Sequence, residues 1–395
     1  MDIAVRKEPE PGERRVAATP DSVRQLVSVG LTVTVERGAG ALAGYADRGY
    51  EEAGARLVET VELETCDVLA HVRPLGLETV ARLRAGSITV GLLSPASNPA
   101  LVRALQGAGI TSFALELVPR ISRAQSMDAL TSQTLIAGYR CVLEAAMRLP
   151  RFFPLFMTAA GTIPPAKVLV LGAGVAGLQA IATAKRLGAK VSAYDVRAAS
   201  AEEVTSMGGT FITLELETAD GAGGYATELA EDRAARQREL LTPHISDADV
   251  VITTAAIPGR PAPRLVTSEM LRGMRSGSVI IDLAAESGGN VEGSVAGVDT
   301  RIALADDLGA VTLVGMKDVA STMPYDASRL YAKNVSNLLA LMTVDGRVEP
   351  DFSDAVVSGA NLTHDGRVTH EPTREALDPV PPVPAPDLTP STGGN

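Results

Sequence analysis

Short apolar runs alternate with segments that carry apolar residues at helical spacing through the first third of the chain. These runs have the length and the β-branched content of buried strands. Strands that alternate with helices are typical of a doubly wound α/β domain with a parallel sheet. The pattern therefore predicts such a domain over about residues 1–125, with strands that begin near Met1, Leu31, Val68, Ser87 and Ile110.

A long helix and a second domain are predicted next. Over residues 126–150, apolar side chains recur every three or four positions until Pro150 ends the pattern. Further apolar runs follow this linking helix and predict a second doubly wound α/β domain over about residues 151–317. A closing helix is expected to return the chain to the first domain, which then includes about residues 318–345.

Two segments lack this regular pattern. Residues 215–238 are polar and acidic with GAGG near their centre. A loop of this length inside a compact domain is typical of a functional flap, so we expect a mobile loop here. The end of the chain is rich in proline, and residues 346–395 are expected to form a flexible tail.

Composition and charge narrow the classes of protein. The chain has 395 residues, with 36 Lys and Arg against 47 Asp and Glu, so its net charge is −11. An acidic chain offers no electrostatic footprint for nucleic acid, and none is expected as a partner. The two cysteines lie far apart with no histidine pair nearby, so neither a disulfide framework nor a metal site is expected.

One apolar stretch resembles a membrane span in length. Residues 168–184 (VLVLGAGVAGLQAIATA) are almost entirely apolar. Their glycines have the spacing of a phosphate-binding turn, so a buried strand, a tight turn and a packed helix are predicted instead. The charged opening MDIAVRKEPEPGERR predicts no export signal. We therefore expect a soluble chain.

The same stretch carries the most specific motif of the sequence. Gly172, Gly174 and Gly177 form the pattern G-x-G-x-x-G between a predicted strand and a predicted helix, and a second strand ends at Asp195. This arrangement is typical of a dinucleotide site, with the pyrophosphate at the helix N-terminus and the carboxylate on the adenosine ribose. The carboxylate favours NAD(H) over NADP(H). Arg197 keeps NADP(H) as an alternative cofactor, because a nearby arginine can accommodate a 2′-phosphate.

A second constellation precedes the linking helix. Arg120, Arg123, Gln125 and Asp128 lie within nine residues of one another. Helix capping explains part of this cluster, because Ser126 can serve as an N-cap and Asp128 suits a first turn. Capping does not explain two arginines and a glutamine, so a binding role is the competing hypothesis.

These segments together resemble one family. The run RISRAQSMD, the segment AGTIPPAKVLVLGAGVAGLQAIATAKRLGA, the loop GGYA, and TTAAIPGRPAP followed by GSVIIDLAAESGGN are similar to the NAD(H)-binding subunit (domain I) of proton-translocating NAD(P) transhydrogenase. The resemblance covers roughly residues 1–341 and extends more loosely to alanine dehydrogenase. It implies two Rossmann-like domains with a nucleotide cleft between them.

The resemblance also implies roles for individual residues near the nicotinamide. Arg120 and Asp128 match residues that hold the nicotinamide end of NAD(H), and Gln125 matches a residue where the two nicotinamides meet. Thr131 replaces a serine of the family, and because it keeps the hydroxyl, the resemblance implies that it contacts the carboxamide. The cofactor-binding run as a whole comprises Arg120, Ile121, Ser122, Gln125, Ser126, Met127 and Asp128.

The remaining implied contacts lie in the second domain. They comprise Ala173, Gly174 and Val175 along the pyrophosphate, Asp195, Val196 and Arg197 at the adenosine ribose, Gly224, Tyr225 and Gln237 on the mobile loop, and Ala256 beside the nucleotide. Tyr225 is counted, with Arg120, Gln125, Asp128 and Thr131, among the residues expected to act in hydride transfer.

The implied function is hydride exchange between NAD(H) on this chain and NADP(H) on a partner subunit. Proton translocation would belong to partner membrane subunits, and the chain would be a homodimer bound peripherally at the cytoplasmic face of the plasma membrane. Hydride transfer between nicotinamide rings needs apposition and exclusion of water but no general acid or base.

Two alternatives stay open. An alanine dehydrogenase would bind a 2-oxo acid and shuttle a proton. The resemblance implies a substrate lysine in the strand matching DVLAHV, where this chain has His71 and no lysine, and a catalytic histidine in the segment matching TVGLLSPAS, which has none. Arg15 does match a substrate arginine. The second alternative is an NAD-binding module without catalytic activity.

Overall fold

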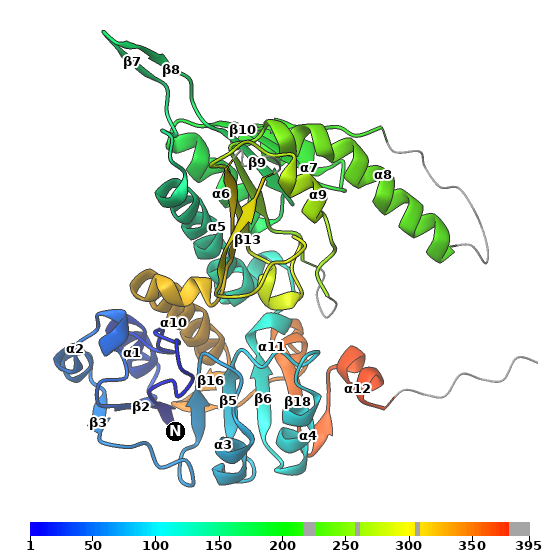
Figure 1. Ribbon diagram of the computed structural model, residues 1–395. Coiled ribbons are helices and arrows are strands. Elements are labelled where there is room, and N and C mark those ends of the chain that lie inside the picture. Colours follow the sequence, from blue (N-terminus) through cyan, green and yellow to red (C-terminus); the bar gives the residue numbers. More distant parts are fainter. Residues whose placement is uncertain (216–225, 257–260, 305–308, 379–395) are drawn as a thin grey trace, which may run out of the picture.

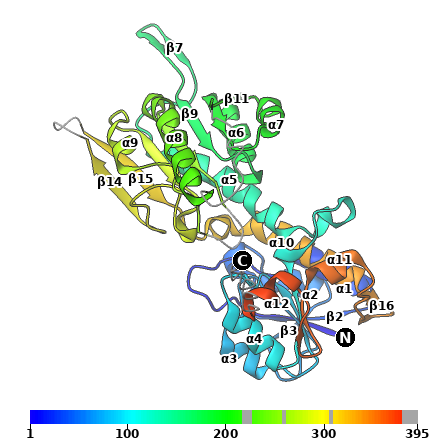
Figure 2. The same ribbon diagram turned by 90° about the vertical axis from the view of Figure 1, so that its right-hand side faces the viewer.

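The computed structural model describes residues 1–215, 226–256, 261–304 and 309–378, without the side chains of residues 226–231. The chain forms two α/β lobes that meet at two long helices, α5 (Ala129–Arg148) and α10 (Pro324–Leu341) (Figures 1 and 2). The two-domain α/β fold with mainly parallel sheets that the sequence predicts is confirmed.

The first lobe is built on a sheet with the strand order β19-β18-β6-β5-β4-β1-β2-β3. Strands β6 to β3 are parallel, and Ile3 at the centre pairs with Val33 on one side and Val68 on the other. Such runs are buried on both faces, which explains their nearly unbroken apolar sequence. The strands are β1 (Asp2–Val5), β2 (Thr32–Glu36), β3 (Arg56–Val58), β4 (Val68–Ala70), β5 (Ile88–Gly91), β6 (Thr111–Ala114), β18 (Asn361–His364) and β19 (Arg367–Val368).

Helices cover both faces of this sheet. Thr19 caps α1 in a capping box with Ser22, and the helix packs against α10 beside the fully buried Tyr331. The helices are α1 (Pro20–Ser28), α2 (Asp47–Glu52), α3 (Leu77–Arg82), α4 (Pro99–Gly107), α11 (Ala355–Ala360) and α12 (Glu371–Leu377), and a small hairpin joins β16 (Thr343–Val344) to β17 (Arg347–Val348).

The second lobe repeats the parallel topology. Its sheet has the order β11-β10-β9-β12-β13-β15-β14, with only β14 antiparallel among the pairs described. The strands are β9 (Lys167–Leu171), β10 (Lys190–Tyr194), β11 (Thr210–Phe211), β12 (Val250–Thr253), β13 (Val279–Asp282), β14 (Asp299–Ala303) and β15 (Ala310–Gly315). The helices are α6 (Val175–Arg186), α7 (Ser200–Ser206), α8 (Ala226–Asp247) and α9 (Ser268–Arg272).

The two lobes are held together by a close helix contact. Helix α5 starts at the first lobe and packs against α6 of the second lobe. At the crossing lies Gly138, where an added Cβ would be 2.2 Å from the carbonyl oxygen of Ala176. Only glycine allows the backbones to come this close.

A short hairpin projects from the second lobe. Strands β7 (Phe156–Thr158) and β8 (Gly161–Ile163) extend away from both lobes, as Figure 1 shows at the top of the view. Met157 is 74% exposed, and Phe156 and Ile163 are also exposed. Apolar side chains on a projecting element indicate a contact surface.

Three sequence-based boundaries are corrected by the structure. The predicted tail over 346–395 is wrong for residues 346–378, because β18 pairs with β6 and extends the first sheet. The acidic segment predicted as a loop over 215–238 is helical from Ala226 onward, in α8. The linking helix starts at Ala129 rather than Ser126, because a 3₁₀ helix occupies Ser122–Met127. Residues 379–395 lie outside the described part of the chain.

No helix in the described ranges combines the length and the apolar character that a membrane crossing requires.

Substitution Gly138→Ala is expected to lower the free energy of unfolding by about 1–3 kcal/mol, because the added methyl forces α5 and α6 apart. The matched control is Gly107→Ala at the end of α4, where an added Cβ meets no atom within 4 Å. The control should be neutral or slightly stabilising. Denaturant unfolding of both variants measures the difference, and equal stability of the two would contradict the packing argument.

Candidate functional site

The glycine-rich turn after β9 has a backbone conformation and close backbone contacts that require glycine at two positions. Gly172 has a left-handed backbone with φ of 106°. An added Cβ on Gly177 would lie 1.8 Å from the carbonyl oxygen of Gly172, so helix and strand can pack only without it. Thr254, at the end of β12, donates from Oγ1 to the same carbonyl at 3.0 Å. The turn is therefore fixed by the sheet beneath it.

Gly174 differs from these two glycines because no packing requires it. A Cβ built on Gly174 would have no protein atom within 4 Å, so open space lies above this backbone. The helix α6 begins at Val175, and the first N–H groups of a helix have no partner inside it. An exposed helix N-terminus under open space suits a pyrophosphate, so the residues present fit the dinucleotide that the motif implies.

Asp195 lies at the end of β10 beside this turn. Its Oδ2 accepts from the backbone N–H of Ala173 at 2.7 Å, and its Oδ1 accepts from Nε of Arg197 at 2.9 Å. Burial alone would raise the pKa of Asp195, but the hydrogen bonds from Arg197 and Ala173 outweigh it and lower the pKa. The carboxylate is thus ionised, and it neutralises the arginine that could otherwise favour a 2′-phosphate.

The run RISRAQSMD is anchored from several directions. The side-chain amides of Asn334 and Asn337 on α10 both donate to the carbonyl of Ser126, at 2.9 and 3.0 Å. Arg123 forms a two-pronged ion pair with Asp354 at 2.7 and 2.8 Å. Anchoring by α10 and by the N-cap of α11 holds the run rigidly at the lobe junction.

Asp128 is the N-cap of α5, whereas the sequence placed it in the first turn of a helix capped by Ser126. It accepts from the N–H of Thr131 at 2.9 Å and from the Thr131 hydroxyl at 2.6 Å. Ser126 is not the cap. The Thr131 hydroxyl is therefore already oriented by Asp128 at the start of the helix.

A cleft of about 660 Å³ separates the glycine-rich turn from the start of α5. Its first wall comes from the first lobe and from α5, and its second from the ends of β12 and β13 and the start of α6. The lining residues are Ser97, Arg120, Leu130, Thr131, Thr134, Gly174, Val175, Ala176, Thr254, Ala256, Pro261, Glu286 and Ser287. The structure thus brings together five residues that the sequence analysis singled out, namely Arg120, Thr131, Gly174, Val175 and Ala256.

Other predicted residues lie outside this lining. Met127 is buried in the core of the first lobe. Gln237, on α8, has an enclosed Nε2 with no partner among the described residues, which leaves a donor available. Gly224 and Tyr225 lie outside the described residues. Those at the surface away from the cleft lining are Ile121, Ser122, Gln125, Ser126, Val196 and Arg197.

Several lining residues were not predicted, although signals for them exist. Thr254 directly follows β12, Glu286 lies in the short turn after β13, and ligands of doubly wound sheets bind at the carboxyl ends of strands. Leu130 and Thr134 are four residues apart around Thr131, so helical spacing puts them on one face.

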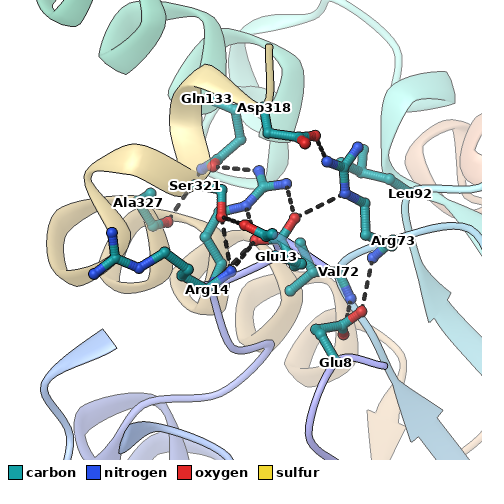
Figure 3. Close-up of polar contacts among 12 residues, drawn as sticks. Glu8, Glu13, Arg14, Val72, Arg73, Leu92, Gln133, Asp318, Ser321 and Ala327 are labelled. Carbon is teal, nitrogen blue, oxygen red and sulfur yellow. Dashed lines mark hydrogen bonds and ion pairs between the residues drawn. The ribbon is translucent and has the colours of Figure 1, made fainter. Parts of the chain in front are cut away.

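Buried charges fill the lobe junction beside the cleft. The side chain of Glu13 has no exposure, and it contacts Nη2 of Arg15 at 2.6 Å and Nε of Arg73 at 2.8 Å (Figure 3). Burial would raise the pKa of Glu13, but the Arg15 guanidinium holds it at about 2. Arg15 also donates to Gln133 of α5 at 2.9 Å, which ties the loop after β1 to the linking helix.

The same network continues toward the cleft. Arg73 forms an ion pair with Asp318, and the backbone N–H of Asp318 donates to Oε2 of Glu286 at 3.1 Å. On the other side, Glu8 accepts from the backbone N–H of Val72 at 2.6 Å, and burial raises its pKa to about 7. The cleft wall is therefore joined to the first lobe by a chain of polar contacts.

A larger hollow of about 820 Å³ lies elsewhere, between α1, α5 and α10. Its lining includes Leu135, Tyr139 and Arg329 but neither the glycine-rich turn nor the anchored run. Size alone does not make it the better candidate, because the dinucleotide motif opens only onto the smaller cleft. Within the described ranges, no group of three or more His, Cys, Asp or Glu side chains could hold a metal ion.

Comparison with known proteins identifies the family of this chain. Residues 4–137 match the family model "Alanine dehydrogenase/PNT, N-terminal domain", and residues 141–371 match "Alanine dehydrogenase/PNT, C-terminal domain". An NAD(P) transhydrogenase subunit alpha of Rhodospirillum rubrum is 46% identical over 387 residues, which cover 94% of this chain and 98% of the relative.

A solved structure shows the same fold. The transhydrogenase of Sinorhizobium meliloti superposes with a TM-score of 0.81 at 44% identity, covering 94% of this chain and 99% of the other. The alanine dehydrogenase of Bacillus subtilis is more distant, at 29% identity over 94% of this chain and 93% of its own length. The chain therefore belongs to the alanine dehydrogenase/PNT family, and within it to the NAD(P) transhydrogenase alpha subunits.

Proposed function

We propose that this chain binds NAD(H) in the cleft and exchanges hydride with NADP(H) held by a partner subunit. The observation that carries the proposal is the open cleft itself, which has a dinucleotide turn on one wall and the anchored run with Arg120 on the other. The pyrophosphate binds at the start of α6, over Gly174. The adenosine ribose binds Asp195, and the nicotinamide reaches Arg120 and Thr131.

The lining chemistry supports hydride transfer rather than proton transfer. Among the described lining residues there is no histidine, cysteine, lysine or tyrosine, and Glu286 is the only carboxylate. Arg120, Thr131 and the helix N-terminus bind and orient a nucleotide. Bound NAD(H) supplies the hydride chemistry, while these residues hold it for a second ring to stack against. Tyr225 and its loop are proposed to close over the nucleotide, and Gln125 and Asp128 to act at the nicotinamide.

The alternative of an alanine dehydrogenase has weaker support. His71 is buried, and its Nδ1 lies 2.7 Å from the carbonyl oxygen of Arg73. Burial lowers the pKa of His71 to about 4, so the ring is neutral at physiological pH. It does not line the cleft, and so it is poorly suited to shuttle protons to a substrate there.

Proton translocation would belong to membrane-embedded partner subunits, with this chain bound peripherally at the cytoplasmic side. The proposal includes a homodimer. Its support is the projecting β7–β8 hairpin, whose exposed Phe156, Met157 and Ile163 need an apolar partner surface. A second copy of this chain is the occupant proposed.

The direct test mixes the purified chain with the NADP(H)-binding domain of a transhydrogenase and follows hydride transfer from NADH to an NADP⁺ analogue by absorbance. We expect transfer only when both proteins are present, because each holds one nucleotide. Pyruvate, ammonium and NADH with this chain alone form the second arm. Turnover in that arm would overturn the proposal in favour of an amino-acid dehydrogenase.

Substitution Asp195→Asn is expected to weaken NADH binding by about tenfold, because a charged hydrogen bond to the ribose is lost. NADPH binding should improve, because Arg197 loses its ion-pair partner. Binding titrations with both nucleotides measure the change. Glu269→Gln, which removes an exposed carboxylate on α9, is the matched control and should alter neither affinity. Unchanged NADH affinity in the Asn variant would contradict the ribose contact.

Substitution Met157→Glu is expected to raise the dimer dissociation constant by at least about tenfold, because a charge would be buried in an apolar interface. Sedimentation velocity over a concentration series measures it. Met207→Glu makes the same change at another exposed methionine of the second lobe and should leave association unchanged. Equal behaviour of the two variants would rule out the hairpin as the dimer contact.

A further inference from the structure

Glu286 is the one acidic residue among the described residues that line the cleft. It lies in the 3₁₀ turn Ala285–Ser287, four residues beyond the end of β13. Across the cleft, Arg120 is the other charged lining residue. A lone carboxylate on a wall that offers no proton-transfer partner needs a role other than acid–base chemistry.

The carboxylate is held in place from behind. Its Oε2 accepts from the backbone N–H of Asp318 at 3.1 Å, and no ion pair within 4.0 Å engages it among the described residues. Asp318 itself has a left-handed backbone with φ of 48° and is secured by its ion pair with Arg73. Glu286 therefore keeps one oxygen free while the other is fixed to the lobe junction.

The charges around Glu286 are mixed. Burial raises the pKa of Glu286, and the nearby cations Arg73, Lys317 and Arg15 offset this rise only in part. Arg73 and Arg15 are already paired with Asp318 and Glu13, so their charges are largely compensated. The negative charge of the ionised Glu286 side chain is therefore not neutralised by an ion pair of its own among the described residues.

The topology puts Glu286 at the nicotinamide half of the site. In the order β11-β10-β9-β12-β13-β15, the glycine-rich turn follows the central β9. Asp195 follows β10 on one side of β9, and Glu286 follows β13 on the other. A dinucleotide bound across this reversal point has its adenosine on the side of Asp195, so its nicotinamide lies on the side of Glu286.

Oxidation changes the charge of that ring and of no other part of the cofactor. The nicotinamide of NAD⁺ carries a positive charge, whereas the dihydronicotinamide of NADH is neutral. A fixed carboxylate nearby attracts the first and not the second, and in a partly solvated cleft the attraction amounts to a few-fold to about tenfold in affinity.

We propose that Glu286 sets the relative affinity of the cleft for NAD⁺ and NADH by stabilising the positive charge of the oxidised ring. The inference rests on the proposed binding of NAD(H) in this cleft. Through this balance the residue would help to keep both nucleotides exchangeable, because a site that bound only the reduced form tightly would resist hydride release. Glu286 acts on the equilibrium between the two forms and transfers no proton.

The test is a pair of binding titrations, with NAD⁺ and with NADH, on the full chain at about pH 8. This pH is chosen because burial raises the pKa of Glu286, and a higher pH favours its ionised form. In Glu286→Gln we expect the ratio of the dissociation constant for NAD⁺ to that for NADH to rise about three- to tenfold. Glu286→Asp should keep a ratio near that of the unchanged chain. Glu269→Gln, the matched loss of one carboxylate away from the cleft, should not alter it.

The outcomes separate the inference from the function on which it rests. An unchanged ratio in Glu286→Gln, or an equal weakening of both nucleotides as expected for a structural role, would overturn the inference while leaving NAD(H) binding intact. Failure of the unchanged chain to bind either nucleotide would instead overturn the proposed function. Comparing thermal unfolding of the variants shows whether each is folded.

Discussion

The geometry of the cleft depends on how closely α5 approaches α6. The first turn of α5 carries Thr131 on one wall, and the first turn of α6 carries the exposed N–H groups on the other. The two helices touch where Gly138 packs on the carbonyl of Ala176, inside that same first turn of α6. Because this backbone contact joins both walls, the distance between the Thr131 wall and the start of α6 depends on main chain as well as on side chains.

The buried ion cluster at the lobe junction complements this contact. Buried ion pairs are weak evidence for stability, because desolvation offsets much of their attraction. They do define an arrangement, since a buried carboxylate with two guanidinium partners tolerates few alternative positions. Glu13 draws together the loop after β1, the loop after β4 and, through Arg15, helix α5. The polar chain from Arg73 through Asp318 then fixes the wall that carries Glu286.

Regular elements and the dinucleotide turn were predictable because their signals are local. Parallel strands gave apolar runs, and the spacing of Gly172, Gly174 and Gly177 reports a turn that the structure confirms by close contacts. The folded end of the chain was missed although a local signal was present. Asp365 and Gly366 both have positive φ in the turn between β18 and β19, and Asp-Gly is a strong hairpin signal. The proline-rich residues that follow this hairpin favour a flexible tail, and they outweighed its signal in the prediction for residues 346–395.

Long-range features could not be predicted from local patterns. Asn334 and Asn337 hold the carbonyl of Ser126 only because α10 returns to the junction of the lobes. The spacing of residues along the sequence does not indicate this return. The opposition of Arg120 and Glu286 likewise arises only when both lobes are assembled. Asp128 shows an intermediate case. The sequence indicated a cap nearby, at Ser126, but the 3₁₀ helix before α5 delays the helix start and makes Asp128 the cap.

The six parallel strands of each lobe follow the same order, yet only one lobe offers a dinucleotide cradle among the described residues. In the second lobe, the reversal point of the sheet is lined by glycines and by open space above Gly174. In the first lobe, the equivalent point beyond β1 and β4 is filled by the chain itself. The carboxylate of Glu8 takes the N–H groups of Val72 and Arg73, and Glu13 takes the guanidinium groups. An anionic ligand there would meet carboxylates that already accept from the available donors, which is the physical reason why this edge of the first sheet offers no second dinucleotide cradle among the described residues.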